Sequence, residues 1–133
     1  MLLHIKPSDT IQEVQNKFKS LFSHLKPEFF KKFHSESDGY AKKEEYMHNI
    51  TMAEITGHQE ALEIHIDAHM STEAFEKMFE EKYHLHVQLM RLQKDSWLIT
   101  TNSQELSLND QNARGIAADE EMAPEMLKDF DAE

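Results

Sequence analysis

The sequence contains no cysteine, which excludes disulfide bonds, thiolate metal ligands and cysteine nucleophiles. Glycine is scarce, and Gly39, Gly57 and Gly115 are too far apart to form a glycine-rich loop that binds a phosphate or a dinucleotide. No apolar run approaches the length of a membrane span, and the N-terminus lacks the basic start and apolar stretch of a secretion signal. We therefore expect a cytoplasmic protein that makes no use of a membrane.

Basic residues are also few: the sequence has 14 Lys and Arg residues and 25 Asp and Glu residues, which gives a formal net charge of −11. A general nucleic-acid binder needs a basic surface, so nucleic acid is not an expected partner. The sequence has neither a nucleophile-elbow serine motif nor a His-Glu-x-x-His helix. No residue is therefore assigned a catalytic role, although 133 residues suffice for one domain with a hydrophobic core.

The clearest structural pattern lies between residues 62 and 101. Residues 62–69 alternate between apolar and polar side chains, which is typical of a half-buried strand. Ser71 can cap the helix that follows, in which Phe75 and Phe79 begin an apolar stripe. Alternation returns at residues 84–90, and a polar break at residues 93–96 separates it from strand formers at residues 97–101. The stretch predicts a strand, a helix and a β-hairpin.

The first part of the chain repeats the start of this pattern. Residues 2–6 predict a strand, Thr10 and Glu13 predict a capping box, and an apolar stripe continues to Leu25. Residues 28–33 predict an edge strand. At an offset of 61 residues, Leu3-His4-Ile5 align with Ile64-His65-Ile66, Thr10 with Ser71, Val14 with Phe75, Phe18 with Phe79 and Phe22 with Tyr83. The chain thus predicts two copies of a strand-helix-strand unit.

Two such units that point the same way favour an α+β fold, namely a ferredoxin-like two-layer sandwich with its helices on one side of an antiparallel sheet and an extra C-terminal strand. The predicted domain covers residues 1–101 and includes an irregular insert at residues 34–59. Residues 102–133 are polar to acidic and predict a tail that is either disordered or docked as a short helix, with disorder favoured.

Histidine is the one chemically suggestive residue, with nine copies. His65, Asp67 and His69 share one strand face, His86 lies on the polar face of a later strand, and His4 is the equivalent of His65 in the other unit. In a ferredoxin-like order these strands are neighbours about 4.8 Å apart. Imidazoles and a carboxylate from them could then hold a divalent transition metal such as zinc, nickel or iron.

Two other interpretations of this histidine row stay open. The row could be a plain polar surface or dimer face, because an open sheet face needs polar side chains. It could also be an interface whose charge changes between about pH 5 and pH 7, where imidazoles titrate. A plain surface needs no cofactor, so none is expected and the metal is the alternative.

The C-terminal part resembles a known pattern. The segment VQLMRLQKDSWLITTNSQELSLNDQNARG combines a basic hairpin, a W-L-x-T-T run, a linker, a leucine and a Q-N-x-x-G ending. It resembles the C-terminal signature of a family of small bacterial proteins of unknown function, and the likeness extends over about residues 1–115. The resemblance implies no activity, cofactor or catalytic residue, and the histidine row is not part of it. The matching positions are Arg91, Lys94, Ser96, Trp97, Leu98, Thr100, Thr101, Leu108, Gln111, Asn112 and Gly115.

The sequence alone does not determine a biochemical function. We expect a small intracellular interaction or self-assembly module that is not an enzyme, with a second copy in a homodimer or another protein as its partner. The alternative is a metal-binding protein, or a metal-dependent hydrolase, that uses the histidine row.

Overall fold

The computed structural model describes residues 1–31 and 44–131, with side chains up to residue 120. None of the helices among these residues combines the length and the apolar character that a membrane crossing requires. The chain is a mixed α+β protein, as predicted. Its elements are β1 (Leu2–Ile5), α1 (Ile11–Leu21), β2 (Leu25–Phe30), α2 (Met52–Thr56), β3 (Leu62–His65), α3 (Thr72–Tyr83), β4 (His86–Gln93), β5 (Ser96–Ile99), a 3-10 turn (Thr101–Ser103) and α4 (Leu108–Asp131).

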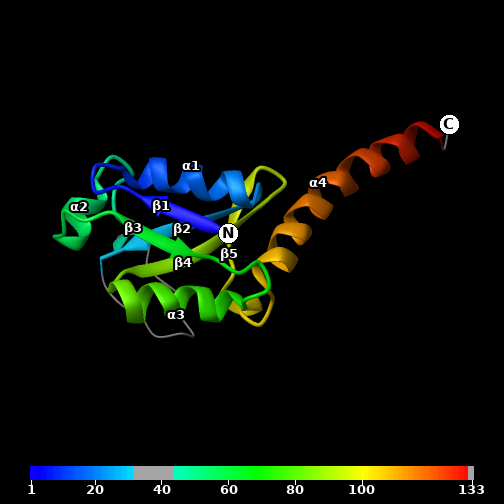
Figure 1. Cartoon of the computed structure of the whole chain (residues 1–133). Coiled ribbons are helices and arrows are strands. Elements are labelled where there is room, and N and C mark those ends of the chain that lie inside the picture. Colours follow the sequence, from blue (N-terminus) through cyan, green and yellow to red (C-terminus); the bar gives the residue numbers. More distant parts are fainter. Residues whose placement is uncertain (32–43, 132–133) are drawn as a thin grey trace.

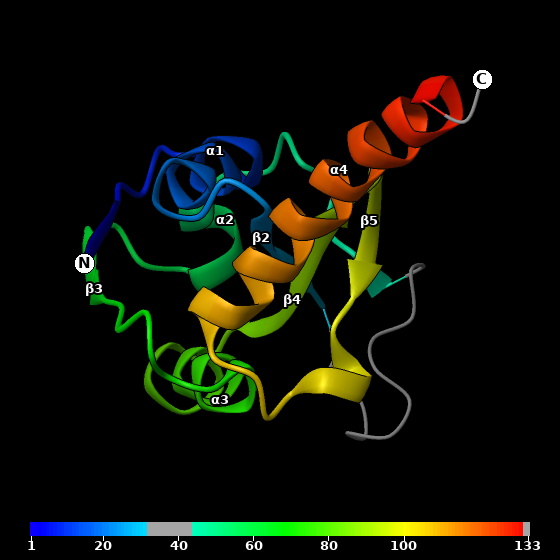
Figure 2. The same ribbon diagram turned by 90° about the vertical axis from the view of Figure 1, so that its right-hand side faces the viewer.

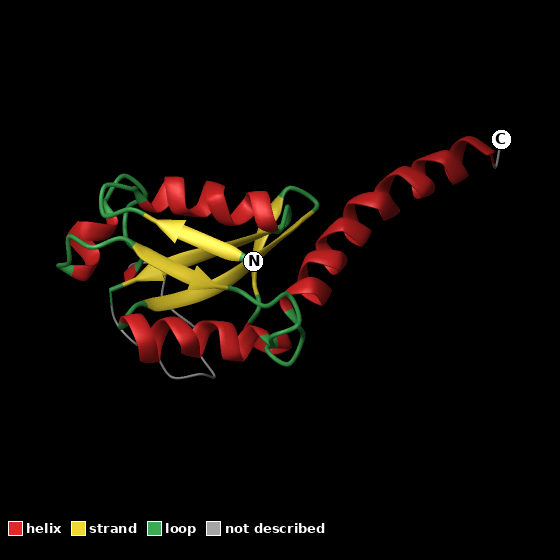
Figure 3. Cartoon of the chain, in the orientation of Figure 1, coloured by secondary structure: helices red, strands yellow, loops and turns green. Residues whose placement is uncertain are grey.

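The strands form two antiparallel sheets. One sheet pairs β1 with β3, and the other has the order β2-β4-β5. Figures 1 and 2 show the two sheets on opposite sides of the core, with α1 and α3 closing the remaining two sides. In Figure 3, which is coloured by secondary structure, the strands of both sheets lie between α1 above and α3 below. The ferredoxin-like sandwich is not confirmed, because the strands do not share one sheet and the helices do not lie on one side.

The predicted repeat is present, with a different geometry. Each unit starts in the two-stranded sheet, crosses the core edge through a helix and ends in the three-stranded sheet. Thr10 and Ser71 are the N-caps of α1 and α3, and Glu13 completes the capping box at Thr10. The units do not point the same way, because β1 pairs antiparallel with β3 and β2 pairs antiparallel with β4. Each helix therefore bridges two sheets and does not fold back onto one.

Aromatic rings fill the space between the sheets. The ring of Phe18 lies 5.4 Å from those of Phe22 and Phe75, and Phe75 lies 5.1 Å from Phe79. All four side chains are at most 2% exposed, so each contributes roughly 2–3 kcal/mol through the burial of apolar surface. The core thus joins the helical stripes of both units. The other buried apolar residues of this core are Leu3, Ile5, Ile11, Val14, Leu25, Phe29, Met52, Ile64, Ile66, Leu85, Val87, Leu89 and Leu108.

Two predicted boundaries in the first half differ from the structure. The first helix ends at Leu21, and Leu25 already belongs to β2. Pro27 does not end the helix but lies inside β2, an outer strand of its sheet, where the missing N–H costs least. Of the predicted edge strand at 28–33 and the predicted insert at 34–59, residues 32–43 lie outside the described residues, whereas residues 44–59 include α2.

Residues after Thr101, predicted as a tail, hold the 3-10 turn and α4. Leu108 and Gln111 are fully buried, and Gln111 Nε2 donates to the Ser103 carbonyl at 2.9 Å. Asn112 Oδ1 accepts a hydrogen bond from the His24 backbone N–H at 2.7 Å. The first half of α4 therefore packs against the core, beyond the end at residue 101 that the sequence predicts for the domain. The second half extends away from the body (Figure 1).

Candidate metal centre

The structure places the predicted metal ligands His4 and His65 on the two-stranded sheet. Both are exposed, and they lie on paired strands, since His4 is opposite Glu63 and His65 is opposite Leu2. Glu63 Oε1 lies 3.6 Å from His4 Nδ1. The prediction that these two histidines occupy neighbouring strands is correct.

The remaining three predicted ligands are not gathered around them. Asp67 Oδ1 accepts the backbone N–H of His69 at 2.8 Å, which closes a turn after β3. His86 belongs to the other sheet, so the prediction that its strand is a neighbour of the strand with His4 is wrong. His86 Nδ1 is instead 2.6 Å from Glu80 Oε2. Among the described residues, these five side chains supply no group of three ligand atoms with the spacing of a metal site.

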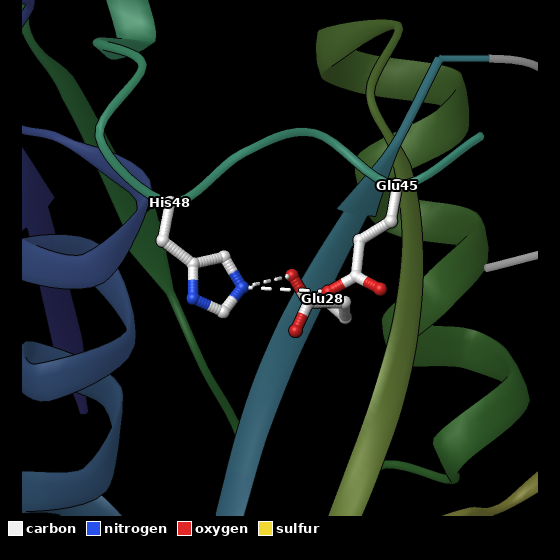
Figure 4. Close-up of side chains that lie close together, drawn as sticks. All are labelled: Glu28, Glu45 and His48. Atoms are coloured by element: carbon white, nitrogen blue, oxygen red, sulfur yellow. Dashed lines mark hydrogen bonds and ion pairs between the residues drawn. The ribbon is translucent and has the colours of Figure 1, made fainter. Parts of the chain in front are cut away.

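A different group has that spacing. One ligand atom each from Glu28, Glu45 and His48 lies within 4.8 Å of the other two. His48 Nε2 is 2.9 Å from Glu28 Oε1 and 3.4 Å from Glu45 Oε1. Figure 4 shows the imidazole pointing its Nε2 between the two carboxylates, with one glutamate on β2 and the other two side chains on the segment that passes it. We call this group the Glu28 cluster.

Backbone hydrogen bonds hold this segment in place. Tyr46 N–H donates to the Phe29 carbonyl at 3.0 Å, which fixes Glu45 beside the outer edge of β2. The His48 carbonyl accepts from the N–H of Gln12 in the first turn of α1 at 3.1 Å. The segment therefore runs from the edge of β2 to the start of α1. Its two ends are tied to regular elements, so the ligand atoms are positioned by the fold and not by a free loop.

The central carboxylate is buried although it lies on the face of β2 opposite to the core. Glu28 is 3% exposed, whereas the side chains of Glu45 and His48 are 24% and 35% exposed. Burial raises the pKa of Glu28; the His48 charge opposes that rise, and the Glu45 charge adds to it. Lys26 Nζ is 3.8 Å from Glu28 Oε2, too far for a hydrogen bond. The cluster thus gathers two carboxylates around one imidazole, and the ammonium group of Lys26 forms an ion pair with the buried carboxylate.

One of the two distances from His48 matches tetrahedral coordination, and the other is shorter. Ligand atoms about 2.1 Å from a zinc-like ion lie about 3.4 Å from one another. The distance from His48 Nε2 to Glu45 Oε1 already has this value, and the distance to Glu28 Oε1 must lengthen by about 0.5 Å. One imidazole and two carboxylates suit zinc, manganese or iron(II). Three protein ligands would leave a further position for water or for another ligand.

Sequence reasoning missed this cluster for a physical reason. Glu45 and His48 are three residues apart in a stretch that the sequence predicts only as part of an irregular insert. Glu28 is separated from His48 by 20 residues of sequence, and only the folding of the segment along β2 brings them together. The available signal was a single acidic residue among the aromatic residues of a predicted strand.

Outside the Glu28 cluster, the half-buried carboxylate of Glu76 lies at the edge of β4. Glu76 of α3 accepts hydrogen bonds from Leu89 N–H at 2.7 Å and from the side-chain amides of Gln88 and Gln104 at 3.1 Å and 2.8 Å. Burial nonetheless raises the pKa of Glu76 to about 7. The hairpin strand β5 ends its pairing at Met90, so Glu76 occupies the edge of β4 where that pairing stops. Glu76 thus accepts the hydrogen bond of a backbone N–H of β4 that has no strand partner at this position.

The residues that carry the family resemblance lie where α4 joins the three-stranded sheet. Arg91 donates to Gln111 at 2.6 Å, and Thr100 Oγ1 donates to the Leu89 carbonyl at 2.8 Å. Gly115 lies so close to Leu92 and His24 that a methyl group would not fit. None of these contacts involves the Glu28 cluster. Comparison of the chain with protein-family models, curated proteins and solved structures found no match.

Proposed function

We propose that this protein binds a divalent transition metal ion through Glu28, Glu45 and His48. The observation that carries the proposal is the convergence of three ligand atoms, from two separate parts of the chain, around a carboxylate that is almost completely buried. This site replaces the histidine row as the candidate location, because the row does not gather three ligands among the described residues.

The charge balance of the cluster supports a cation. Two ionised carboxylates near one another repel, and removing either from water is costly unless an opposite charge is bound. Lys26 lies 3.8 Å from Glu28 only, and the single Nε2 of His48 cannot bond to both carboxylates with full strength. A divalent ion supplies two positive charges and accepts a lone pair from all three groups. The metal-bound form is then the one in which every group of the cluster is satisfied.

Thermal unfolding tests the proposal. The protein is stripped of metal on a chelating resin and unfolded at about pH 7.5 with added zinc, manganese, nickel or iron(II). Binding to the folded state stabilises it by about 2.7 kcal/mol when the free ion is at a hundred times the dissociation constant, which raises the midpoint by several degrees. Each variant is compared with its own metal-free form, so that any loss of stability from the substitution itself is removed.

His48→Ala and Glu45→Gln are the informative variants, and His65→Ala is the matched control because it removes an exposed histidine of the other sheet. We expect one metal to raise the midpoint of the unsubstituted protein and of His65→Ala, and to leave His48→Ala unchanged. Equal shifts in His48→Ala and the unsubstituted protein would reject the Glu28 cluster as the site. The absence of a saturable shift with all four ions would reject metal binding.

A second candidate function is self-association in a homodimer or interaction with another protein. The observation in its favour is β5, an outer strand whose Leu98 and Ile99 are 39% and 59% exposed. Among the described residues β5 pairs only with β4, and its four residues contain none of the lysine or proline residues that protect exposed edges. An unprotected apolar edge favours pairing with another chain.

Light scattering coupled to gel filtration tests this candidate at micromolar concentrations. A dimer that becomes a monomer in Ile99→Lys, but not in the exposed-site control Lys77→Gln, would support association through β5. A monomeric protein at all accessible concentrations would reject self-association and leave only a different partner chain.

A further inference from the structure

Ser23, His24 and Asp119 form a chain of hydrogen-bonded side chains away from the Glu28 cluster. Ser23 Oγ lies 2.8 Å from His24 Nδ1, and His24 Nε2 lies 2.6 Å from Asp119 Oδ2. Both distances are within the range of a hydrogen bond. A hydroxyl, an imidazole and a carboxylate therefore follow one another in the order that activates a serine nucleophile.

The fold fixes the imidazole at the centre of this chain. The His24 N–H donates to Asn112 Oδ1 of α4 at 2.7 Å, and the His24 carbonyl accepts the Leu92 N–H of β4 at 2.8 Å. The His24 side chain is 17% exposed. Since its backbone is tied to two other elements, the ring is positioned by the fold and not only by the turn between α1 and β2.

Helix α4 brings the carboxylate to the ring. Gly115 and Asp119 are four residues apart, so they lie on one face of α4, one turn from each other. A Cβ at Gly115 would lie 2.8 Å from the Cβ of His24, so a side chain there would push α4 away from the imidazole. The Lys94 N–H, in the turn between β4 and β5, donates to Asp119 Oδ1 at 3.1 Å. Asp119 is therefore held by a backbone group as well as by His24.

These contacts determine which ring nitrogen carries the proton. Hydrogen bonds from His24 and from the Lys94 N–H lower the pKa of Asp119, so its carboxylate is ionised at neutral pH and accepts the proton on Nε2. In a neutral imidazole the other nitrogen then has a free lone pair. That lone pair, on Nδ1, faces Ser23 Oγ. Ser23 is exposed, so a molecule from solution can reach its hydroxyl.

We propose that Ser23 is a nucleophile that small carboxylic esters acylate, with His24 as the general base and Asp119 as a positioning residue. Ser23 Oγ attacks the ester carbonyl carbon while its proton passes to His24 Nδ1. The bond to the leaving oxygen then breaks, and the proton on Nδ1 goes to the departing alcohol. Water attacks the acyl-serine by the same route, which releases the carboxylic acid and returns a proton to Ser23. The net reaction is the hydrolysis of one ester by one water.

Labelling with an alkyl fluorophosphonate tests the nucleophile. The serine oxygen attacks phosphorus, fluoride leaves and His24 takes the hydroxyl proton; mass spectrometry of the digested protein then locates the adduct. Metal-free protein is used so that a hydroxide on a metal ion does not contribute. We expect an adduct on Ser23 in the unsubstituted protein and in Ser20→Ala, which removes another exposed hydroxyl, but not in Ser23→Ala. The absence of an adduct on Ser23 would overturn the proposal.

The release of p-nitrophenol from p-nitrophenyl acetate tests the hydrolysis. General base catalysis contributes about 10²–10⁴-fold, so Ser23→Ala and His24→Gln should each lower the protein-dependent rate at least about a hundredfold. His65→Gln, which changes an exposed histidine of the other sheet, should keep the full rate. A full rate in Ser23→Ala would mean that the serine is not the nucleophile and would overturn the proposal.

Asp119 acts only through His24, so its test must separate positioning from stability. In Asp119→Asn the side-chain amide can donate to the ring, which favours the proton on Nδ1 and removes the acceptor for the serine hydroxyl. We expect this variant to be labelled on Ser23 at least about tenfold more slowly. Asp119→Glu keeps a carboxylate and should recover part of the rate. Equal labelling rates in Asp119→Asn and the unsubstituted protein would contradict the positioning role.

Discussion

Glu76 gives the sharpest prediction, because a half-buried carboxylate with a pKa of about 7 makes the stability of the fold depend on pH. Burial raises the pKa, and the hydrogen bonds from Leu89 and Gln104 only partly offset that effect. A group whose pKa is higher in the folded state than in the unfolded chain stabilises the fold while it is protonated. That contribution is complete below about pH 4.5 and is lost as the pH rises through about 7.

The size of the effect follows from the two pKa values. The rise from 4.5 to about 7 corresponds to about 3 kcal/mol between the fully protonated and fully ionised limits. Between about pH 5.5 and pH 8.5, linkage gives a loss of about 2 kcal/mol from this one residue. In Glu76→Gln the side chain is neutral at every pH and still offers an oxygen to the Leu89 N–H. The variant should therefore lack this loss.

Urea unfolding at several pH values measures the effect. The free energy of unfolding of Glu76→Gln, minus that of the unsubstituted protein, should increase by about 2 kcal/mol from about pH 5.5 to pH 8.5. Glu81→Gln, which removes an exposed carboxylate from the same helix, is the control for a general change of charge. A difference between Glu76→Gln and the unsubstituted protein that is independent of pH would refute the reasoning.

Two further predictions concern single contacts. In Gly115→Ala the new Cβ would lie 2.5 Å from the Leu92 carbonyl oxygen and 2.8 Å from His24 Cβ, so α4 must shift. We expect the free energy of unfolding in urea to fall by about 1–3 kcal/mol. The exposed change Ala117→Ser is the neutral control. Thr10→Ala removes the oxygen that accepts the Glu13 N–H and should lower the free energy of unfolding by about 1 kcal/mol. Thr10→Ser keeps that oxygen and should lower it much less. Equal losses in both variants would contradict the capping assignment.

Local patterns were sufficient for the two repeated units. Each N-cap is a Thr or Ser side chain directly before a helix with apolar residues at helical spacing, and both Thr10 and Ser71 are N-caps as the sequence predicts. The side chains of Phe75 and Phe79 face the core because their spacing matches the helical period. These features involve residues within a few positions of one another, so the sequence alone contains the information.

The arrangement of the units was not accessible in this way. Alternation along β1 and β3 shows that each strand has one buried face, but it does not specify which strand is the neighbour or in which direction it runs. Once β1 pairs antiparallel with β3, the strand with His86 enters the other sheet, and the predicted histidine row is divided. The predicted ferredoxin-like fold placed these histidines together only because it assumed that their strands are neighbours in one sheet.

The sequence by itself determined the α+β class, the two strand-helix-strand units, their caps and most of the apolar side chains that face the core. Only the tertiary structure decided the two-sheet pairing, the docking of α4 and the Glu28 cluster. The division has one physical reason. Helix and strand periodicity is a property of neighbouring residues, whereas the Glu28 cluster joins Glu28 to a histidine 20 residues away, and such a contact exists only after the chain has folded.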